Sequence, residues 1–341
     1  MHTFFNKLYM ASLITSVFSL PAVNAQAGDY ASFAGNAKAE KFISRMVKEH
    51  DFDHSELKQL FNSTYLRDDI IKAMTRPAEG KPWYDYRPIF LTESRINGGI
   101  AFWKKHAALL ADIEKKYGVD SSVVIAIVGV ETRYGNNTGS YRVIDALSTL
   151  AFGYPPRGKF FSKELEQFLI LTREEKVDIR KAKGSYAGAM GLGQFIPSSY
   201  REYAVDYDGD KRRDLWTSMG DILGSVANYL HVHGWELHGP VAYQAKAGKT
   251  PPKSLLDEGY KPKRTLEYFL TRDLSLDTQL DKKTPAAIIS LKQKSGPEYW
   301  LTMKNFYVIT RYNRSPLYAM AVFQLSQEIK AGFQKQAQKG K

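Results

Sequence analysis

Apolar residues recur every three to four positions over much of the chain, which is the spacing of one face of an α-helix. Six segments carry this pattern: 37–73, 92–116, 121–134, 162–172, 219–233 and 316–330. Within the first of them, Asp53 precedes a new apolar stretch and offers its side chain as a helix N-cap. The pattern predicts a mainly helical protein.

The segments between these helices are of two kinds. Three are loops rich in aromatic residues, glycine or proline, at 76–86, 153–158 and 184–197. We expect the third of these to surround a short helix. The other kind is a stretch in which prolines and lysines separate short apolar runs, interpreted as strands at 286–289, 299–301 and 306–309. The sequence therefore predicts a small β-rich insertion at about 239–310, and a flexible tail at 331–341.

The first residues have the layout of a secretory signal peptide. A short basic stretch with Lys7 is followed by an apolar run of 13 residues at 8–20, and Val23 and Ala25 are the small residues that a signal peptidase recognises. We expect cleavage after Ala25, which would remove 1–25. The alternative is an N-terminal membrane anchor, for which the run is short, because a helix needs about 20 apolar residues to span a bilayer.

The composition limits how an exported chain could be anchored and what it could bind. There is no cysteine, which excludes both disulfides and the lipid-modified cysteine of bacterial lipoproteins. The net charge is +12, to which the signal contributes only Lys7. A basic surface favours nucleic acid, anionic lipid or an acidic polymer, and export argues against nucleic acid. We therefore expect a soluble protein of the periplasm that has no lipid anchor and binds an acidic polymer.

Glu131 is the main candidate for chemistry. It ends an almost wholly apolar helical segment, and at helical spacing it shares a face with Ile127 and Val128. A carboxyl in such surroundings loses hydration, so its pKa rises and it can hold the proton that a general acid gives to a glycosidic oxygen. The alternative is a solvated glutamate at a helix end, although the helix dipole disfavours a carboxylate at the C-terminal end.

Two motifs around this glutamate identify a family. The segments at 130–135 and 184–198 read VETRYG and GSYAGAMGLGQFIPS. They resemble the lytic murein transglycosylases, in particular the membrane-bound lytic murein transglycosylase B family, whose core is lysozyme-like. A later pair, Tyr312 and Asn313, follows in the family's order.

The resemblance extends over nearly the whole mature chain, from about 33 to 325. It implies a transglycosylase region at 26–330, with a lysozyme-like catalytic core at about 121–235. The helical parts at 33–120 and 316–330 would complete that region around the β-rich insertion.

The resemblance also implies a reaction. Members of the family cleave the β-1,4 bond between N-acetylmuramic acid and N-acetylglucosamine in peptidoglycan, an acidic cell-wall polymer, without using water. Glu131 would protonate the leaving oxygen and then take a proton from the muramyl C6 hydroxyl, which attacks C1 and closes a 1,6-anhydro ring. Ordinary glycosidases need two carboxylates, and the motifs contain no second acid. We expect a monomeric enzyme with one catalytic glutamate, no cofactor for its chemistry and the glycan strand as its partner.

Two other functions stay open on the sequence alone. A hydrolytic muramidase on the same fold would differ in its product. A non-catalytic peptidoglycan-binding protein would have kept the cleft without the chemistry, although the intact motif around Glu131 argues against it.

By resemblance, eight residues are expected to contact the substrate: Tyr86, Arg157, Ser185, Gln194, Tyr229, Tyr312, Asn313 and Tyr318. The glycines between Ser185 and Gln194 let the backbone approach a sugar closely. These two side chains can hydrogen-bond acetamido and hydroxyl groups, or orient Glu131. Arg157 would suit the lactyl or peptide carboxylate of the muramyl unit.

The acidic loop at 206–221 resembles part of a calcium-binding EF-hand. Positions one, three, five and nine are aspartates and position seven offers a backbone carbonyl: Asp206, Asp208, Asp210, Asp214 and Arg212. The pattern departs from a standard EF-hand, because Lys211 stands at position six and Thr217 takes the place of a bidentate glutamate. In the family a later aspartate closes the site, and Asp221 is the candidate here. We expect a structural Ca²⁺, and the alternative is a solvated polar turn.

Overall fold

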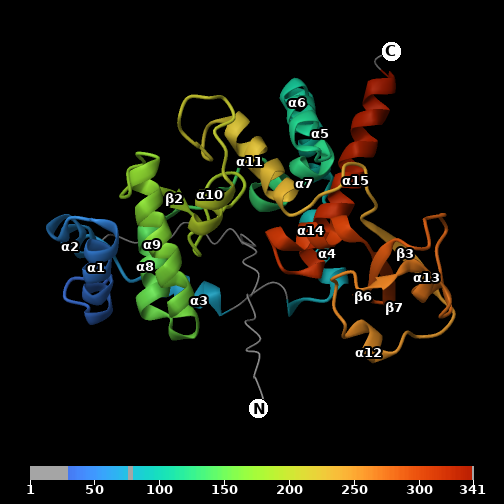
Figure 1. Ribbon diagram of the computed structural model, residues 1–341, viewed down its shortest axis with the longest axis horizontal. Coiled ribbons are helices and arrows are strands. Elements are labelled where there is room, and N and C mark those ends of the chain that lie inside the picture. Colours follow the sequence, from blue (N-terminus) through green and yellow to red (C-terminus); the bar gives the residue numbers. More distant parts are fainter. Residues whose placement is uncertain (1–29, 76–79, 340–341) are drawn as a thin grey trace.

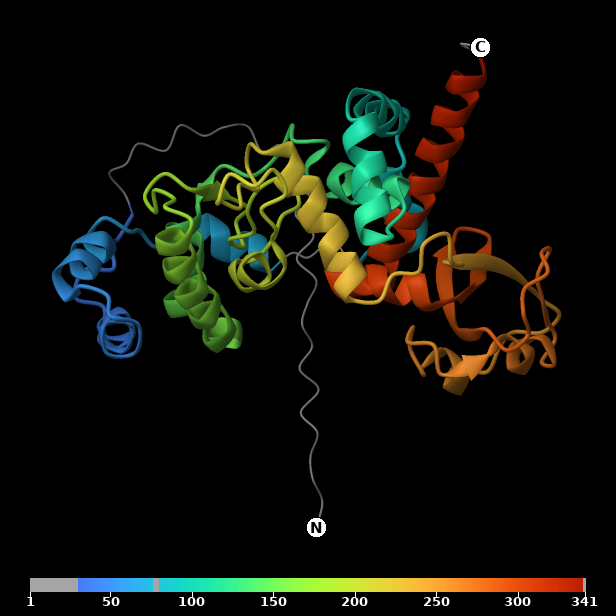
Figure 2. The same ribbon diagram turned by 45° about the horizontal axis from the view of Figure 1, so that its top comes forward.

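The computed structural model describes residues 30–75 and 80–339, so the expected signal peptide at 1–25 lies outside the described residues. The described chain is elongated (Figures 1 and 2). Helices α1 (Ala37–His50) and α2 (His54–Asn62) lie at one end and a five-stranded sheet at the other. The other helices lie between these two ends, except α12 (Lys253–Leu256) and α13 (Leu266–Leu270), which lie beside the sheet (Figure 1).

The first helical group packs around an aromatic cluster. Helix α1 lies against α2 and α9 (Gly158–Glu174), and α8 (Val143–Gly153) packs along α9 and contacts α3 (Asp68–Met74). Phenylalanine rings meet edge to face with centroids 5.4–5.9 Å apart: Phe33, Phe42, Phe61 and Phe152. Such pairs add to the free energy gained by burial alone.

The helix starts in this group follow from side-chain caps. The Asn36 side chain accepts hydrogen bonds from the first turn of α1, and Asp53 accepts one from the Glu56 N–H of α2. These oxygens satisfy backbone donors that have no partner inside the helix. The helix start predicted at Asp53 is confirmed.

The second helical group surrounds α7 (Ser121–Thr132), whose residues from Ser121 to Val130 are all buried. Helix α15 (Pro316–Lys339) packs along α7 and also contacts α4 and α5. The remaining helices of the group are α4 (Trp83–Phe90), α5 (Glu93–Lys105), α6 (Ala107–Tyr117) and α14 (Lys304–Tyr312). Because α7 is apolar on all sides, it requires neighbours on all sides, and these helices supply them.

A middle region joins the two groups. Strand β1 (Tyr141–Arg142) pairs antiparallel with β2 (Lys183–Gly184), and the glycine-rich turn follows β2 directly. After the turn come α10 (Pro197–Tyr203), the acidic loop and α11 (Met219–Val232). Helix α11 contacts α6, α7 and α14, so it ties the middle region to the second helical group.

The insertion is an antiparallel sheet with the order β4-β6-β7-β3-β5. Its elements are β3 (Ala242–Ala247), α12 (Lys253–Leu256), β4 (Arg264–Thr265), α13 (Leu266–Leu270), β5 (Leu274–Ser275), β6 (Pro285–Gln293) and β7 (Gly296–Thr302). Residues such as Leu266, Phe269 and Leu301 form a core of their own, whereas Ile289 and Leu291 join the main core. The predicted β-rich insertion is confirmed.

The fold class is confirmed as mainly helical, but four local predictions are wrong. The segment 92–116 is two helices that break at His106. The aromatic loop predicted at 76–86 gives way to a helix at Trp83. No helix forms between β2 and α10, and the run 306–309 belongs to α14, not to a strand.

The physical reason for these errors is that short apolar runs fit more than one element. Four apolar residues in a row at 306–309 can be a buried strand or one turn of a buried helix. In the same way, the apolar period continues across His106, so it does not register the break. The final helix is also longer than predicted, because α15 continues past residue 330 to Lys339.

No helix within residues 30–75 and 80–339 combines the length and the apolar character that crossing a membrane requires.

Candidate active site

Glu131 lies in the last turn of α7, where a buried helix opens onto a cleft. Arg133 ends the helix in the left-handed region, with a φ of 52°. The neighbouring Thr132 hydroxyl lies 3.2 Å from the Val128 carbonyl oxygen and 3.0 Å from that of Leu192. The end of α7 is therefore joined to the glycine-rich turn, which fixes the direction in which Glu131 points.

The Glu131 carboxyl is held by one hydrogen bond. The Tyr318 hydroxyl, from α15, donates to Glu131 Oε1 at 2.7 Å. Burial among apolar residues raises the pKa of Glu131 to about 8, and the Tyr318 hydrogen bond opposes that rise. At neutral pH the carboxyl therefore holds its proton, as the sequence predicted from the apolar helix.

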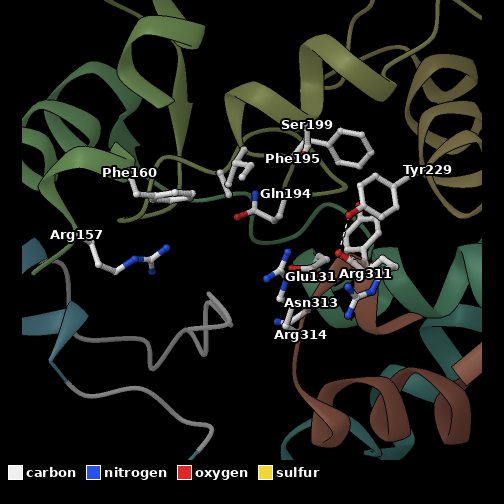
Figure 3. Close-up of a pocket in the computed structure, with 13 residues that line it drawn as sticks. Glu131, Arg157, Phe160, Gln194, Phe195, Ser199, Tyr229, Arg311, Asn313 and Arg314 are labelled. Carbon is white, nitrogen blue, oxygen red and sulfur yellow. Dashed lines mark hydrogen bonds between the residues drawn. The ribbon is translucent and has the colours of Figure 1, made fainter. Parts of the chain in front are cut away.

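The cleft that contains Glu131 has about 780 Å³ of empty space, which includes open solvent at its mouth. Figure 3 shows its lining residues. Thirteen residues line it: Glu131, Arg157, Phe160, Ala189, Gln194, Phe195, Ile196, Ser199, Tyr229, Arg311, Tyr312, Asn313 and Arg314. Glu131 is the one acid among these lining residues. The lining residues therefore offer a single carboxyl group for a reaction in the cleft.

The glycine-rich turn forms one wall of the cleft. Gly188 and Gly191 have φ values of +79° and +69°, which favour glycine. Gln194 takes φ = 52°, and its Nε2 donates to the carbonyl oxygens of Gly191 at 2.9 Å and Thr138 at 3.1 Å. These bonds hold the Gln194 side-chain amide at the wall of the cleft.

Three aromatic rings form the adjoining wall. Tyr229 lies 4.9 Å from Tyr312 and 5.9 Å from Phe195, between ring centroids. The Tyr312 hydroxyl donates to the Gly193 carbonyl at 2.5 Å, and the Tyr229 hydroxyl donates to the Arg311 carbonyl at 2.6 Å. The two tyrosine rings are thus fixed by their hydroxyl groups, and the three rings together give this wall of the cleft an apolar surface.

Arg157 and Phe160 lie on the opposite side of the cleft, at the start of α9 (Figure 3). The Arg157 guanidinium lies over the rings of Phe160 and Phe161, at 4.5 and 5.0 Å from their centroids. Burial lowers the pKa of Arg157 from its ordinary value, although it remains a cation. Across from it, the buried Asn313 Oδ1 has no hydrogen-bond partner among the described residues.

Three residues of the expected substrate-contact set are not cleft-lining residues. Ser185 is buried within the turn, where its hydroxyl oxygen accepts from the N–H groups of Ala187 and Ala189. Tyr318 lies behind Glu131 as its hydrogen-bond donor. Tyr86 is fully buried on α4, packed on Phe90 with ring centroids 5.1 Å apart. The other five residues of the set line the cleft.

The sequence did not single out several lining residues: Phe160, Phe195, Ile196, Ser199, Arg311 and Arg314. Phe195 and Ile196 stand inside the glycine-rich motif, and the two arginines flank Tyr312 and Asn313. A search for neighbours of the motif residues would have found these four. Phe160 and Ser199 carry no signal of their own, because an aromatic residue and a serine near helix starts are common.

The acidic loop lies between α10 and α11. Carboxylate oxygens of Asp206, Asp208 and Asp210 lie within 4.8 Å of one another. Two oxygens on opposite sides of a Ca²⁺ are about 5 Å apart, so this spacing fits the ion. The Arg212 backbone N–H donates a hydrogen bond to Asp210 Oδ1. Arg212 therefore uses its N–H in this contact and not its carbonyl oxygen.

The two later aspartates hold the loop closed. Asp221 is fully buried, and its carboxylate oxygens accept from the N–H groups of Tyr207 and Asp214, both at 2.7 Å. Asp214 Oδ1 accepts from the N–H groups of Trp216 and Thr217. Neither of these aspartates belongs to the close cluster among the described residues.

The family assignment follows from comparison with known proteins. Residues 34–327 match the model of the transglycosylase SLT domain. The chain is 40% identical over 307 residues to the protein named membrane-bound lytic murein transglycosylase B of Escherichia coli, covering 87% of this chain and 84% of that protein. The chain belongs to the transglycosylase SLT domain family. The resemblance predicted from the two motifs is thereby confirmed.

Solved structures of this family have the same fold. The lytic transglycosylase SltB1 of Pseudomonas aeruginosa superposes with a TM-score of 0.83 at 45% identity, over 88% of this chain and 99% of that one. The lytic transglycosylase Slt35 of Escherichia coli, solved in complex with calcium, gives 0.81 at 39% identity, over 88% and 95%. SltB3 of Pseudomonas aeruginosa, in complex with NAG-NAM-pentapeptide, gives 0.76 at 30%, over 85% and 78%.

Proposed function

We propose that Glu131 is the single general acid and base of this enzyme. The enzyme is a lytic murein transglycosylase, a lyase that cleaves the β-1,4 bond between N-acetylmuramic acid and N-acetylglucosamine in peptidoglycan without water and leaves a 1,6-anhydromuramyl product. One observation carries the proposal: Glu131 is the one acid among the residues that line the cleft, and burial raises its pKa to about 8.

The first step needs a proton donor. With a pKa of about 8, the Glu131 carboxyl is protonated at neutral pH. It gives this proton to the glycosidic oxygen, the C1–O bond of the muramyl sugar breaks, and positive charge develops at C1. Among the described residues, no second carboxylate lines the cleft to balance that charge. The acetamido oxygen of the muramyl sugar itself is the group that can shelter C1.

The second step needs a base. After the first step Glu131 is a carboxylate, and the Tyr318 hydroxyl stabilises it through the 2.7 Å hydrogen bond. The carboxylate removes the proton of the muramyl C6 hydroxyl, and O6 forms the new bond to C1. The proton is thus returned to Glu131, and the ring closes without any water molecule.

We assign the remaining residues to two tasks. Gln194, Tyr229, Tyr312, Asn313 and Arg157 line the cleft and would bind the sugars and the lactyl or peptide carboxylate. The buried Asn313 Oδ1 is suited to accept from an acetamido N–H.

The other three expected residues would act from behind the cleft wall. Tyr318 contacts Glu131 directly, and Tyr86 packs on Phe90 in the core. Ser185 holds the turn that carries Gln194. In this proposal they position the cleft more than they contact substrate.

We also propose a structural Ca²⁺ in the acidic loop. The carboxylates of Asp206, Asp208 and Asp210 would bind the ion together with the Arg212 carbonyl, and Asp214 and Asp221 would shape the loop around it or complete its ligands. A relative has been solved in complex with calcium. None of these loop residues lines the cleft, so the ion would have no part in the chemistry.

For its location, we propose a signal peptide at 1–25 and a monomer that acts in the periplasm. The apolar run at 8–20 and the absence of cysteine support export without a lipid anchor. A relative solved with NAG-NAM-pentapeptide supports glycan strands that carry peptides as the partner.

The product tests the function. Purified sacculi are digested with the mature protein in ¹⁸O-labelled water, and the muropeptides are analysed by mass spectrometry. A lytic transglycosylase gives 1,6-anhydro ends that contain no label. Reducing muramyl ends that carry ¹⁸O would identify a hydrolytic muramidase, and no cleavage at all would identify a binding protein.

A further inference from the structure

The cleft is electropositive. Three arginines line it, and its one acid holds a proton at neutral pH. Arg311, Asn313 and Arg314 lie beside Glu131, across the cleft from Arg157 and Phe160 (Figure 3). The cleft therefore has a cationic group on each side, and such a surface attracts the anionic parts of a ligand.

Arg311 presents a guanidinium that is held in place but not paired. Its plane lies over the Tyr307 ring, 4.3 Å from the centroid. Its Nη2 donates to the Thr310 hydroxyl at 3.3 Å, and its buried Nε has no hydrogen-bond partner among the described residues. No carboxylate within residues 30–75 and 80–339 forms an ion pair with it.

Arg314 is exposed and is also without a carboxylate partner in the described part of the chain. Its backbone is fixed, because its carbonyl accepts from the Tyr260 hydroxyl at 3.2 Å. Burial raises the pKa of Tyr229, and the positive charges of Arg311 and Arg314 both oppose this rise. Both charges therefore act on the same side of the cleft.

Some arginines elsewhere in the protein form ion pairs with carboxylates. Arg142 pairs with Asp145 at 2.6 Å, Arg201 with Glu174 at 2.7 Å and Arg264 with Glu258 at 2.8 Å. Burying part of a guanidinium without a hydrogen-bond acceptor costs free energy. A bound anion would offset that cost, because it accepts hydrogen bonds from the guanidinium. The pair beside Glu131 thus has the properties of a binding site for a carboxylate.

We propose that Arg311 and Arg314 form a second anion subsite, which binds a free carboxylate of a peptide stem and makes the enzyme prefer peptide-bearing glycan strands to denuded ones. This inference rests on the proposed function. Muramyl sugars alternate with glucosamine along the strand, so a cut beside one muramyl sugar places its stem on one side of the bond. The next stem, on the other side of the bond, is attached to the muramyl sugar two positions further along the strand. Cationic groups on both sides of the cleft match these two stems.

The experiment compares two substrates for each variant. One is isolated peptide-bearing glycan strands, and the other is the same strands stripped of their peptides by an amidase. Initial rates give kcat/KM for both, and the measured quantity is the ratio of peptide-bearing to denuded. In the variant R311Q/R314Q we expect this ratio to fall about tenfold or more, because KM for the peptide-bearing strands rises. The reason is the loss of hydrogen bonds between charged groups. R311K/R314K should recover part of it, because the charge remains without the planar fork.

The matched control is Arg180→Gln, an exposed arginine outside the lining of the cleft, which should leave the ratio at the wild-type value. An unchanged ratio in R311Q/R314Q would overturn the proposal. So would an equal loss on both substrates, which would assign the two arginines to sugar binding. Failure of the proposed function is a separate result, because the wild-type enzyme would then release no anhydro ends from either substrate.

Discussion

Two opposing influences act on the Glu131 carboxyl. Burial at the end of α7 removes water from it and raises its pKa to about 8, whereas the hydroxyl of Tyr318 stabilises the carboxylate and opposes that rise. Burial is the larger influence, so the group is a proton donor at neutral pH. The hydrogen bond keeps the ionised form accessible, which the second step needs.

We expect kcat/KM to fall above about pH 8, because the free enzyme must carry the proton on Glu131, and this group loses it as the pH rises through its pKa. In Tyr318→Phe the carboxylate loses its donor, so the pKa of Glu131 rises further. The alkaline limb of the pH profile should then move to higher pH. The measurement is kcat/KM against pH for both proteins.

The control for this prediction is Tyr229→Phe. Its hydroxyl donates to the Arg311 carbonyl and not to Glu131, so its alkaline limb should stay where the wild-type limb is. A Tyr318→Phe limb that moves to lower pH, or does not move, would mean that another group titrates.

The chemistry of Glu131 could be predicted from the sequence because its causes are local. The apolar residues that desolvate it, such as Ile127 and Val128, precede it by four and three positions on the same helix. Its partner Tyr318 lies 187 positions away. No local pattern indicates that contact, and only the family resemblance brought Tyr318 into consideration. For the same reason the burial of Tyr86 on α4 was not foreseen.

At the scale of elements, the site depends on how α7 and the glycine-rich turn fit together. The Thr132 hydroxyl is within hydrogen-bond distance of the Leu192 carbonyl, and Leu192 N–H donates to the Leu215 carbonyl at 3.0 Å. Gly191 lies between these contacts with a φ of +69°, and a Cβ added to it would overlap the Leu215 carbonyl oxygen. The position therefore needs glycine for its backbone angle and for its lack of a side chain.

We expect Gly191→Ala to destabilise the protein more than Gly259→Ala does. Gly259 has a similar φ of +79°, but a Cβ there would meet nothing within 4 Å. The control variant therefore measures the cost of a left-handed alanine alone, about 1 kcal/mol. Gly191→Ala adds the overlap and should also lower kcat, because the turn carries Gln194. Urea denaturation and initial rates measure both effects, and equal destabilisation by the two variants would contradict this account.

The elements themselves were predictable to different degrees. Long periodic segments such as α7 and α11 were found almost to the residue, because many positions support one period. The paired runs in β6 and β7 were also found. The run that begins at Phe306 was misread, because four residues do not separate a strand from a helix.

At the scale of the whole molecule, the cleft is assembled from parts that are far apart in the sequence. The end of α7, the turn before α10, the start of α9 and the connection from α14 to α15 all contribute lining residues. Periodicity predicts each part but not its place, since tertiary packing decides that. Resemblance to a family supplied the arrangement that local physics could not.

The acidic loop makes a prediction at this scale. If Ca²⁺ binds the folded protein and not the unfolded chain, it stabilises the fold by about 2.7 kcal/mol when its concentration is a hundred times Kd. We expect Ca²⁺ to raise Tm, and Asp208→Asn to remove most of that rise. Asp257→Asn, an exposed aspartate outside the cluster, is the control. Equal Tm values with Ca²⁺ and with a chelator would remove the calcium site from this account.

The central claim is that the Glu131 carboxyl acts first as the general acid and then as the general base. The most direct test compares the wild-type enzyme with Glu131→Gln on sacculi. Glutamine keeps the shape and can still accept from Tyr318, but it cannot donate and recover a proton. We expect the release of anhydro-muropeptides to fall by about 10²- to 10⁴-fold. Release of these products by Glu131→Gln at the wild-type rate would contradict the account.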